Sequence, residues 1–235
     1  MKRLLAVLVL SLTTVVAAHA QFGIVGGFTS SATFVDTQNP MENLKNVSLF
    51  HAGVAYKVKM GPMFVLEPAL MYQMKGANLH ESVASVKSGA TTLTDMSKSF
   101  DSKTGYVELS LGAQLGIDLL AFRPYLLFEP FVGVKVYDAE NYASSWKVGT
   151  AEFTGGSEDI NKALSGAKNL IEGGFGVGAG VELVNHVQIS VQWFMNLGKL
   201  YNEDKLNQDV LADVKANYKD IHNYQGVKLT LGIFF

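Results

Sequence analysis

Eight stretches of this chain alternate apolar residues with polar or small ones, the pattern of a β-strand with two different faces. The last stretch is the clearest, because Val227, Leu229, Leu231, Ile233 and Phe235 share one parity and glycine, lysine and threonine share the other. The predicted strands are residues 22–30, 47–58, 63–75, 106–117, 123–137, 170–183, 187–196 and 225–235. The pattern therefore predicts an all-β protein.

The segments between these strands alternate in length. Tight turns are predicted near residues 59–62, 118–122 and 184–186, and long polar loops at 31–46, 76–103, 138–169 and 198–224. This arrangement is typical of a transmembrane barrel in a bacterial outer membrane, with short periplasmic turns and long outer loops. We therefore expect an eight-stranded antiparallel up-and-down transmembrane barrel, in which each strand has about the ~10 residues that a tilted spanning strand needs.

Two of the long loops carry apolar residues at helical spacing. In the third loop these are Ile160, Ala163, Leu164 and Ala167, preceded by Ser157, Glu158 and Asp159 as capping residues. In the fourth loop they are Leu206, Val210, Leu211 and Val214. The sequence predicts a short helix in the third loop and an amphipathic helix over residues 203–217 in the fourth.

Composition separates a membrane barrel from a soluble one. The chain is 48% hydrophobic and only 17% charged, which is poor in charge for a soluble domain. The polar parity of the strands holds mainly Gly, Ser, Thr and Gln, which suits a narrow lumen better than a surface in bulk water. A soluble periplasmic ligand-binding barrel is the alternative. The net charge of −2 gives no basic footprint for nucleic acid.

The first 20 residues have the organisation of a secretory signal peptide. Lys2 and Arg3 precede an apolar core at 4–12, and small residues end at Ala18-His19-Ala20. We predict a signal peptide at 1–20, a barrel domain at 21–235, and an outer-membrane location after cleavage. The chain has no cysteine, so disulfides and thiolate chemistry are excluded.

The inward parity collects charged side chains along the length of the barrel. The predicted lumen network consists of Glu67, Glu108, Arg123, Glu129, Lys135, Glu182 and Lys228. Charges confined in a low-dielectric interior must pair or be neutralised. Up-and-down order predicts the pairs Arg123–Glu182 and Glu108–Lys135.

The sixth predicted strand places Gly174, Gly176, Gly178 and Gly180 on its inward face, which leaves a wall without side chains. Four aromatic residues can fold over this wall, namely Tyr106, Tyr125, Phe131 and Phe194. Since an eight-stranded barrel is only wide enough for side chains to fill, we expect a plugged lumen. The terminal Phe235 is predicted to anchor the last strand at the membrane boundary.

Candidate chemistry in the sequence is sparse. His51, His80, His186 and His222 have neither i, i+4 spacing nor an acidic cluster beside them, so no metal site and no cofactor are expected. A membrane-embedded hydrolase built on Ser110, Glu108 and His51 is a rival hypothesis, but Ser110 is predicted to lie deeper than His51. The sequence favours a non-enzymatic scaffold without catalytic residues.

Pro68 and Pro130 lie within predicted strands, where proline cannot donate its ladder hydrogen bond. We expect a local bulge or an unpaired carbonyl at each position.

The segments 67–76, with Glu67-Pro68-Ala69-Leu70, and 123–133, with Arg123-Pro124-Tyr125 and Glu129-Pro130-Phe131-Val132-Gly133, resemble the PorT-like outer-membrane β-barrel family. The glycine-alternating strand and the closure on phenylalanine are similar too. The resemblance spans the mature chain and implies the barrel architecture. For such an outer-membrane barrel we expect contact with outer-membrane lipid, insertion by the barrel assembly machinery, and extracellular or envelope protein partners at the outer loops. The resemblance to this family also suggests an alternative function, as an accessory component of a protein secretion system.

Overall fold

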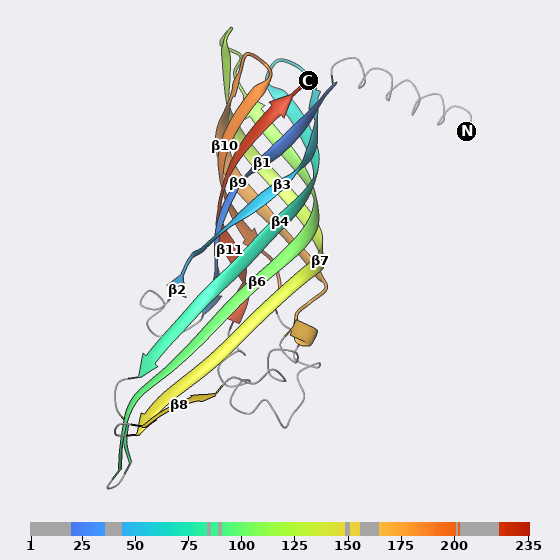
Figure 1. Ribbon diagram of the computed structural model, residues 1–235. Coiled ribbons are helices and arrows are strands. Elements are labelled where there is room, and N and C mark those ends of the chain that lie inside the picture. Colours follow the sequence, from blue (N-terminus) through green and yellow to red (C-terminus); the bar gives the residue numbers. More distant parts are fainter. Residues whose placement is uncertain are drawn as a thin grey trace, which may run out of the picture.

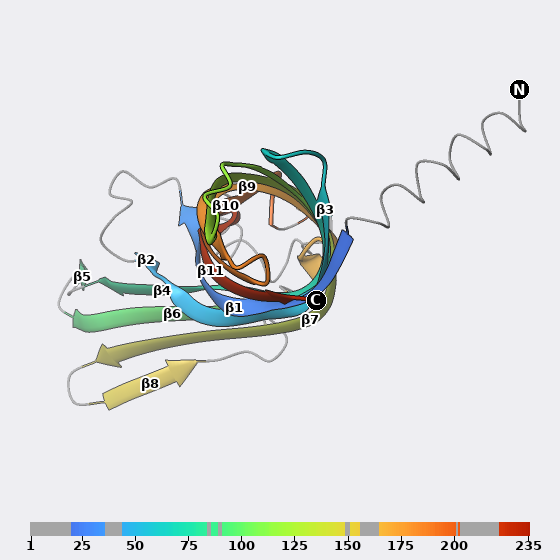
Figure 2. The ribbon, with the colours of Figure 1, turned by 90° about the horizontal axis from the view of Figure 1, so that it is seen from above.

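The computed structural model describes residues 20–35, 44–83, 86–88, 91–148, 151–155, 165–200, 202 and 221–235. The structure is all-β, and eight of its strands close into an antiparallel barrel (Figures 1 and 2). These strands are β1 (Ala20–Val35), β3 (Val47–Lys59), β4 (Phe64–Val83), β6 (Thr91–Gly116), β7 (Phe122–Val148), β9 (Ile171–Leu183), β10 (Val187–Asn196) and β11 (Ile221–Phe234). Each strand pairs with the next, and β1 pairs with β11 to close the ring. The predicted fold class is confirmed.

The outer wall of the barrel is apolar on every strand. Large side chains of one parity are exposed, among them Ile24, Phe28, Phe50, Leu70, Leu109, Leu111, Leu126, Phe128, Val132, Val177, Val191, Trp193, Leu229 and Leu231. The opposite parity is buried and polar, with His51, Gln73, Glu108, Gln114, Gln192 and Lys228 among its members. The barrel therefore has its apolar face outside and its polar face in the interior, which is the reverse of a soluble barrel. We call the outward apolar set the apolar belt.

The two phenylalanines at the C-terminus lie on opposite faces of β11. Phe234 is fully buried in the lumen, and its ring lies 3.7 Å from Nζ of Lys57. Phe235 is 70% exposed, and its backbone N–H donates to the carbonyl of Phe22 at 2.8 Å. Parity placed Phe235 on the outer face, but it gave no role to Phe234, which fills the short-turn end of the lumen.

Pro68 and Pro130 each lie beside a gap in the hydrogen-bonded ladder. The pairing of β4 with β3 is interrupted at Pro68, and that of β7 with β6 at Pro130, with the same register on both sides of each gap. The structure thus shows a gap rather than a bulge at these positions, because proline has no N–H to donate. A shallow groove of about 480 Å³ opens there in the outer wall, lined by Pro68, Leu109, Ser110, Leu111, Pro130, Phe131 and Val132.

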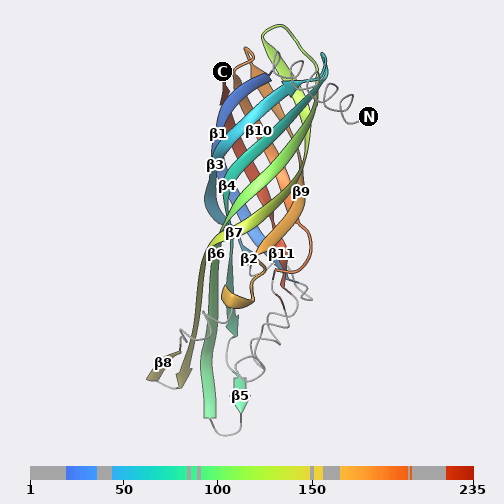
Figure 3. The same cartoon turned by 90° about the vertical axis from the view of Figure 1, so that its right-hand side faces the viewer.

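The predicted loops at 76–103 and 138–169 are wrong over much of their length. β4, β6 and β7 continue as paired strands well beyond the barrel, where they are joined by β5 (Val86–Ser88) and β8 (Ala151–Gly155). We call residues 76–83, 86–88, 91–104, 138–148 and 151–155 the outer extension; it projects from the loop end to one side (Figures 1 and 3). Register shifts near Thr94 and Gly105 break the alternation that marks a strand in the sequence.

A further short strand, β2 (Leu44–Lys45), pairs with β4 where the extension leaves the barrel. Residues 165–167 form one helical turn at the end of the predicted third-loop helix, whose other residues lie outside the described part of the chain. The predicted helix at 203–217 and the predicted signal peptide also lie outside it, apart from Ala20. Among the described residues, no helix is long and apolar enough to cross a bilayer.

The glycine wall on β9 gives space to side chains from neighbouring strands. A Cβ atom built on Gly174 would lie 2.5 Å from Cζ of Phe131, and one on Gly180 would lie 2.5 Å from Cζ of Tyr125. Gln192 from β10 fills the corresponding space at Gly176. The prediction that Tyr125 and Phe131 fold over the wall is therefore confirmed, and these glycines are required by close approach rather than by backbone conformation.

Candidate functional site

The centre of the lumen is organised around Lys75 on β4. Its Nζ lies 2.7 Å from Oε1 of Glu108 and 3.0 Å from Oε1 of Glu172, and it donates to Oδ1 of Asn196 at 3.0 Å. The Asn196 amide donates in turn to the second oxygen of Glu172. The lysine is 1% exposed and lies 4.3 Å from the centre of the Phe131 ring. One ammonium group thus contacts two carboxyl groups, which come from the two strands on either side of β7.

Two further carboxylates lie closer to the short turns. Glu129 on β7 accepts from Nζ of Lys228 at 2.7 Å and from the Gln192 amide at 3.2 Å. The half-buried Glu67 on β4 accepts instead from two amides, Gln114 at 2.7 Å and Gln188 at 3.3 Å. The predicted residues Glu67, Glu129 and Lys228 therefore all point into the barrel interior, each with a polar partner.

The loop end of the barrel is occupied by a lysine from outside the strands. Lys168 follows the helical turn at 165–167, and its buried Nζ donates to Oδ1 of Asp138 at 2.9 Å and to hydroxyls of Ser102, Thr104 and Tyr224. Lys135 contacts Oδ2 of the same Asp138 at 2.9 Å. This arrangement ties the chain between β8 and β9 to the barrel mouth.

The predicted pair Glu108–Lys135 is wrong. Lys135 lies opposite Tyr106 in the register, one step farther from the lumen centre than Glu108, and it turns to Asp138 three residues along its own strand. Glu108 takes its counter-charge from Lys75 on the strand at its other side.

His51 and Ser110 do not form a catalytic arrangement in the structure. Both ring nitrogens of His51 lie 2.9 Å from threonine hydroxyls, Thr29 at Nδ1 and Thr230 at Nε2. The Ser110 hydroxyl lies within the wall beside the proline gap, without a hydrogen-bond partner among the described residues. In the part of the chain that the structure describes, no base therefore accepts a hydrogen bond from this serine. The described residues also contain no group of three His, Asp or Glu side chains that could hold a metal ion.

The short-turn end holds a further charged cluster, centred on Glu182 of β9. Its Oε2 lies 3.1 Å from Nζ of Lys57 and 3.7 Å from Nη1 of Arg123, so the predicted neighbours Arg123 and Glu182 lie together. Its Oε1 lies 3.6 Å from Nζ of Lys59. Arg123 also lies 3.6 Å, through Nε, from Oδ1 of the exposed Asp118. Three cations thus surround one buried carboxylate.

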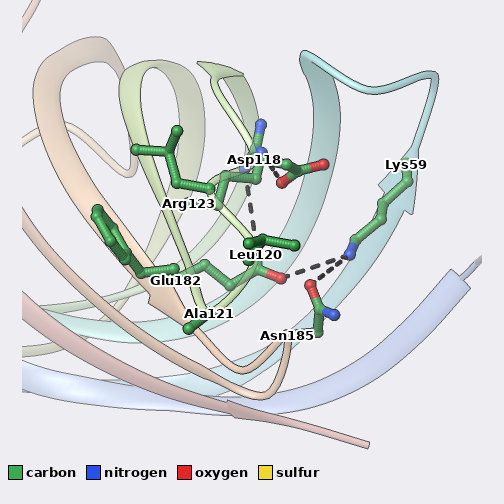
Figure 4. A pocket seen from close by; sticks show the side chains of 9 residues that line it. Lys59, Asp118, Leu120, Ala121, Arg123, Glu182 and Asn185 are labelled. Atoms are coloured by element: carbon green, nitrogen blue, oxygen red, sulfur yellow. Dashed lines mark hydrogen bonds and ion pairs between the residues drawn. The ribbon is translucent and has the colours of Figure 1, made fainter.

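This cluster forms the floor of an open pocket of about 590 Å³ at the short-turn mouth (Figure 4). The pocket is lined by Lys59, Asp118, Leu119, Leu120, Ala121, Phe122, Arg123, Glu182 and Asn185. The Asn185 side chain accepts from Nζ of Lys59 at 3.1 Å and lies beside it in the view. The lining is contributed by three strands, β3, β7 and β9, and by the two turns that follow β6 and β9.

Several residues of these clusters were missing from the predicted network. Lys57 and Lys75 share the inward parity of their strands, so alternation had already marked them as lumen residues. Glu172 lies at the start of β9, where alternation is weakest. Lys168 and Asp138 lie in predicted loops, and no periodic signal could have identified them.

Comparison with known proteins gives fold-level matches only. The chain is similar to Ail, the attachment invasion locus protein of Yersinia pestis, with 10% identity and a TM-score of 0.37 over 92% of this chain and 99% of that one. It is also similar to Neisserial surface protein A (NspA), with 12% identity and a TM-score of 0.36 over 92% and 97% of the two chains. A structure of Ail with the heparin analogue sucrose octasulfate matches at 10% identity and a TM-score of 0.36. No family model and no curated protein matches the chain.

Proposed function

We propose that this chain is an integral outer-membrane protein whose barrel is a non-enzymatic scaffold for the outer extension and loops. The apolar belt carries the proposal, because large apolar side chains such as Phe28, Leu109 and Trp193 are exposed around the whole barrel wall. Exposed apolar surface of this extent is unfavourable in water and favourable against lipid tails. A closed barrel also leaves no unpaired strand edge in the hydrocarbon, which a membrane-spanning sheet requires.

The interior supports a scaffold that passes no solute. Charged layers at Lys168, Lys75, Lys228 and Glu182 follow one another along the barrel, separated by buried aromatic rings such as Phe194. A conducting lumen needs a continuous column of water, whereas these side chains are paired with one another across the interior. We therefore propose a plugged lumen.

The outer extension is the surface that we propose for contact with an extracellular or envelope protein. Its strands are paired through their backbones, β4 with β6, β6 with β7 and β7 with β8, so it forms a continuous sheet beyond the barrel. Binding residues are concentrated on segments that a rigid scaffold holds in place, and the barrel is such a scaffold for this sheet.

Export and insertion complete the proposal. Residues 1–20 act as a signal peptide that is removed, and the barrel assembly machinery inserts residues 21–235 among outer-membrane lipids. The short turns then face the periplasm and the outer extension faces outward. We include membership of the PorT-like barrels in the proposal on the strength of the two segments beginning at Glu67 and Arg123, without a role in secretion.

Carbonate washing and planar-bilayer recording test the two halves of this proposal. We expect the protein to remain in the membrane pellet after washing at alkaline pH, because the apolar belt holds it in lipid. The purified protein should produce no steady, discrete conductance steps. Release into the soluble fraction would favour a soluble barrel, and discrete steps that depend on Glu108 or Lys75 would show an open pore.

Replacing Phe235 by aspartate should reduce the amount of folded protein in the outer membrane. Phe235 is exposed at the short-turn boundary, where a carboxylate costs up to about 1 kcal/mol and the aromatic contact is lost. The measurement is the folded fraction in outer-membrane preparations, seen as heat-modifiable migration in gels. Phe235→Tyr is the matched control and should assemble normally. If Phe235→Asp assembles as well as the wild type, Phe235 does not anchor the last strand.

A further inference from the structure

The pocket at the short-turn mouth has a floor that is fixed before any ligand arrives. Arg123 and Glu182 are 3% and 1% exposed. The Arg123 guanidinium donates to Oε1 of Gln114 at 3.0 Å and to the carbonyl of Met63 at 3.1 Å. The buried Nζ of Lys57 lies 3.1 Å from Oε2 of Glu182. Because these groups are committed to one another, the floor presents fixed charges in a fixed place.

The rim of the pocket carries two more accessible groups of opposite sign. Lys59 is 31% exposed and Asp118 is 54% exposed. Figure 4 shows them on different sides of the opening, with the Glu182 carboxylate below. Lys59 uses one N–H toward Asn185 and lies 3.6 Å from Glu182, so its ammonium group has further donor capacity.

The remaining wall is apolar. Leu119 and Phe122 are exposed at 47% and 45%, and Leu120 is completely exposed at the tip of the turn between β6 and β7. The backbone of Leu120 has a φ of 57°, a left-handed conformation that is uncommon for leucine. The turn therefore holds a leucine side chain in solvent at the entrance to a charged pocket.

The charges of the lining decide which ligand class fits. Lys59 and Arg123 contribute two positive charges, and Asp118 and Glu182 contribute two negative charges. At the accessible rim a simple anion would meet Asp118 and a simple cation would meet Lys59, so a ligand of one sign is repelled by one of the two rim groups. A ligand that carries both charges a short distance apart can pair with each rim group. The volume of about 590 Å³ lies within the usual range for small-molecule sites.

We propose that this pocket binds a zwitterionic amino-acid group, with its carboxylate on Lys59, its ammonium on Asp118 and its hydrocarbon part against Leu119 and Leu120. The compartment rests on the proposed function, since the short turns then face the periplasm and its cell wall. Two sources share this chemistry there: a free amino acid, and a cell-wall peptide with an unlinked amino-acid end. Either would be read by the same charge pair.

Isothermal titration of the purified full-length mature protein in detergent micelles tests the proposal. The probe is 2,6-diaminopimelate, with pimelate as the match without ammonium groups and 1,5-diaminopentane as the match without carboxylates. We expect diaminopimelate to bind at least tenfold more tightly than either match. The proposal is overturned if diaminopimelate does not bind or if either match binds as tightly.

Two conservative variants locate the binding. Lys59→Gln and Asp118→Asn each remove one charge from the exposed rim and should each weaken diaminopimelate binding at least tenfold. Their folding is checked by heat-modifiable migration, and Lys103→Gln, at an exposed position near the loop end, is the charge-matched control. Unchanged binding in both rim variants would place the ligand elsewhere and refute the assignment.

Two further measurements distinguish the two sources of the ligand and separate the binding proposal from the membrane proposal. A tripeptide in which one end of diaminopimelate stays unlinked supports a cell-wall peptide if it binds more tightly than the free amino acid, and a free amino acid if it binds more weakly. Titration in micelles does not require the native membrane. A failure of carbonate retention would therefore refute the membrane proposal without affecting the binding result, and the reverse also holds.

Discussion

Replacing Lys75 by methionine is expected to lower the free energy of unfolding by roughly 3–5 kcal/mol, because it leaves buried carboxylates without their counter-charge. Lys75 is 1% exposed, and its Nζ lies 2.7 Å from Glu108 and 3.0 Å from Glu172. Methionine keeps the apolar part of the side chain as far as Cε and lacks the ammonium group and its hydrogen bonds. The measurement is urea unfolding in lipid or detergent micelles, followed by the loss of heat-modifiable migration.

The triple variant Lys75→Met, Glu108→Gln, Glu172→Gln provides the decisive control. It removes the two carboxylates together with the cation, so most of the lost stability should return. Lys59→Met serves as a second comparison, because Lys59 is 31% exposed and a partly exposed pair contributes up to about 1 kcal/mol. A loss below about 1 kcal/mol in Lys75→Met would show that the contacts of Lys75 with Glu108 and Glu172 do not stabilise the barrel. No recovery in the triple variant would show that the loss does not come from the unpaired carboxylates.

The strand pattern in the sequence was enough to predict the barrel. Alternation places Leu109 outward and Glu108 inward on any two-faced strand, and a closed antiparallel ring follows from short and long connections in turn. The outer extension escaped prediction because its strands are rich in Ser and Thr and because register shifts near Thr94 and Gly105 interrupt the two-residue period. Serine and threonine are common in loops, so composition alone could not distinguish a paired strand from a loop in these segments.

The ion pairs of the lumen were harder to predict than the faces of the strands. Arg123 and Glu182 lie opposite each other in neighbouring strands, so strand order alone brought them together. Lys57 on β3 reaches Glu182 on β9, and Lys75 on β4 reaches Glu172 on β9, in both cases between strands that do not pair. Contacts across a lumen depend on strand tilt and stagger, which the periodicity of a sequence does not contain.

The glycine wall gives the second large effect, since Gly178→Val should prevent stable closure of the barrel. A Cβ atom at Gly178 would lie 2.7 Å from Cα of Gln192 and still closer to the carbonyl oxygen of Val191, so the obstacle is the backbone of β10. Backbone in a closed ring of strands cannot move aside without disturbing the pairing of β9 with β10. Overpacking of this kind typically costs about 1–3 kcal/mol and sometimes more.

Gly173→Val is the matched control for this prediction, because it makes the same change five positions earlier on the same strand. There a Cβ atom would meet nothing closer than the carbonyl oxygen of Phe131 at 3.7 Å, an ordinary contact, and valine favours a strand. We expect Gly173→Val to assemble like the wild type, while Gly178→Val shows little folded, heat-modifiable protein and a lower urea midpoint. If the two variants assemble equally well, the close approach of the β10 backbone to Gly178 does not limit closure of the barrel.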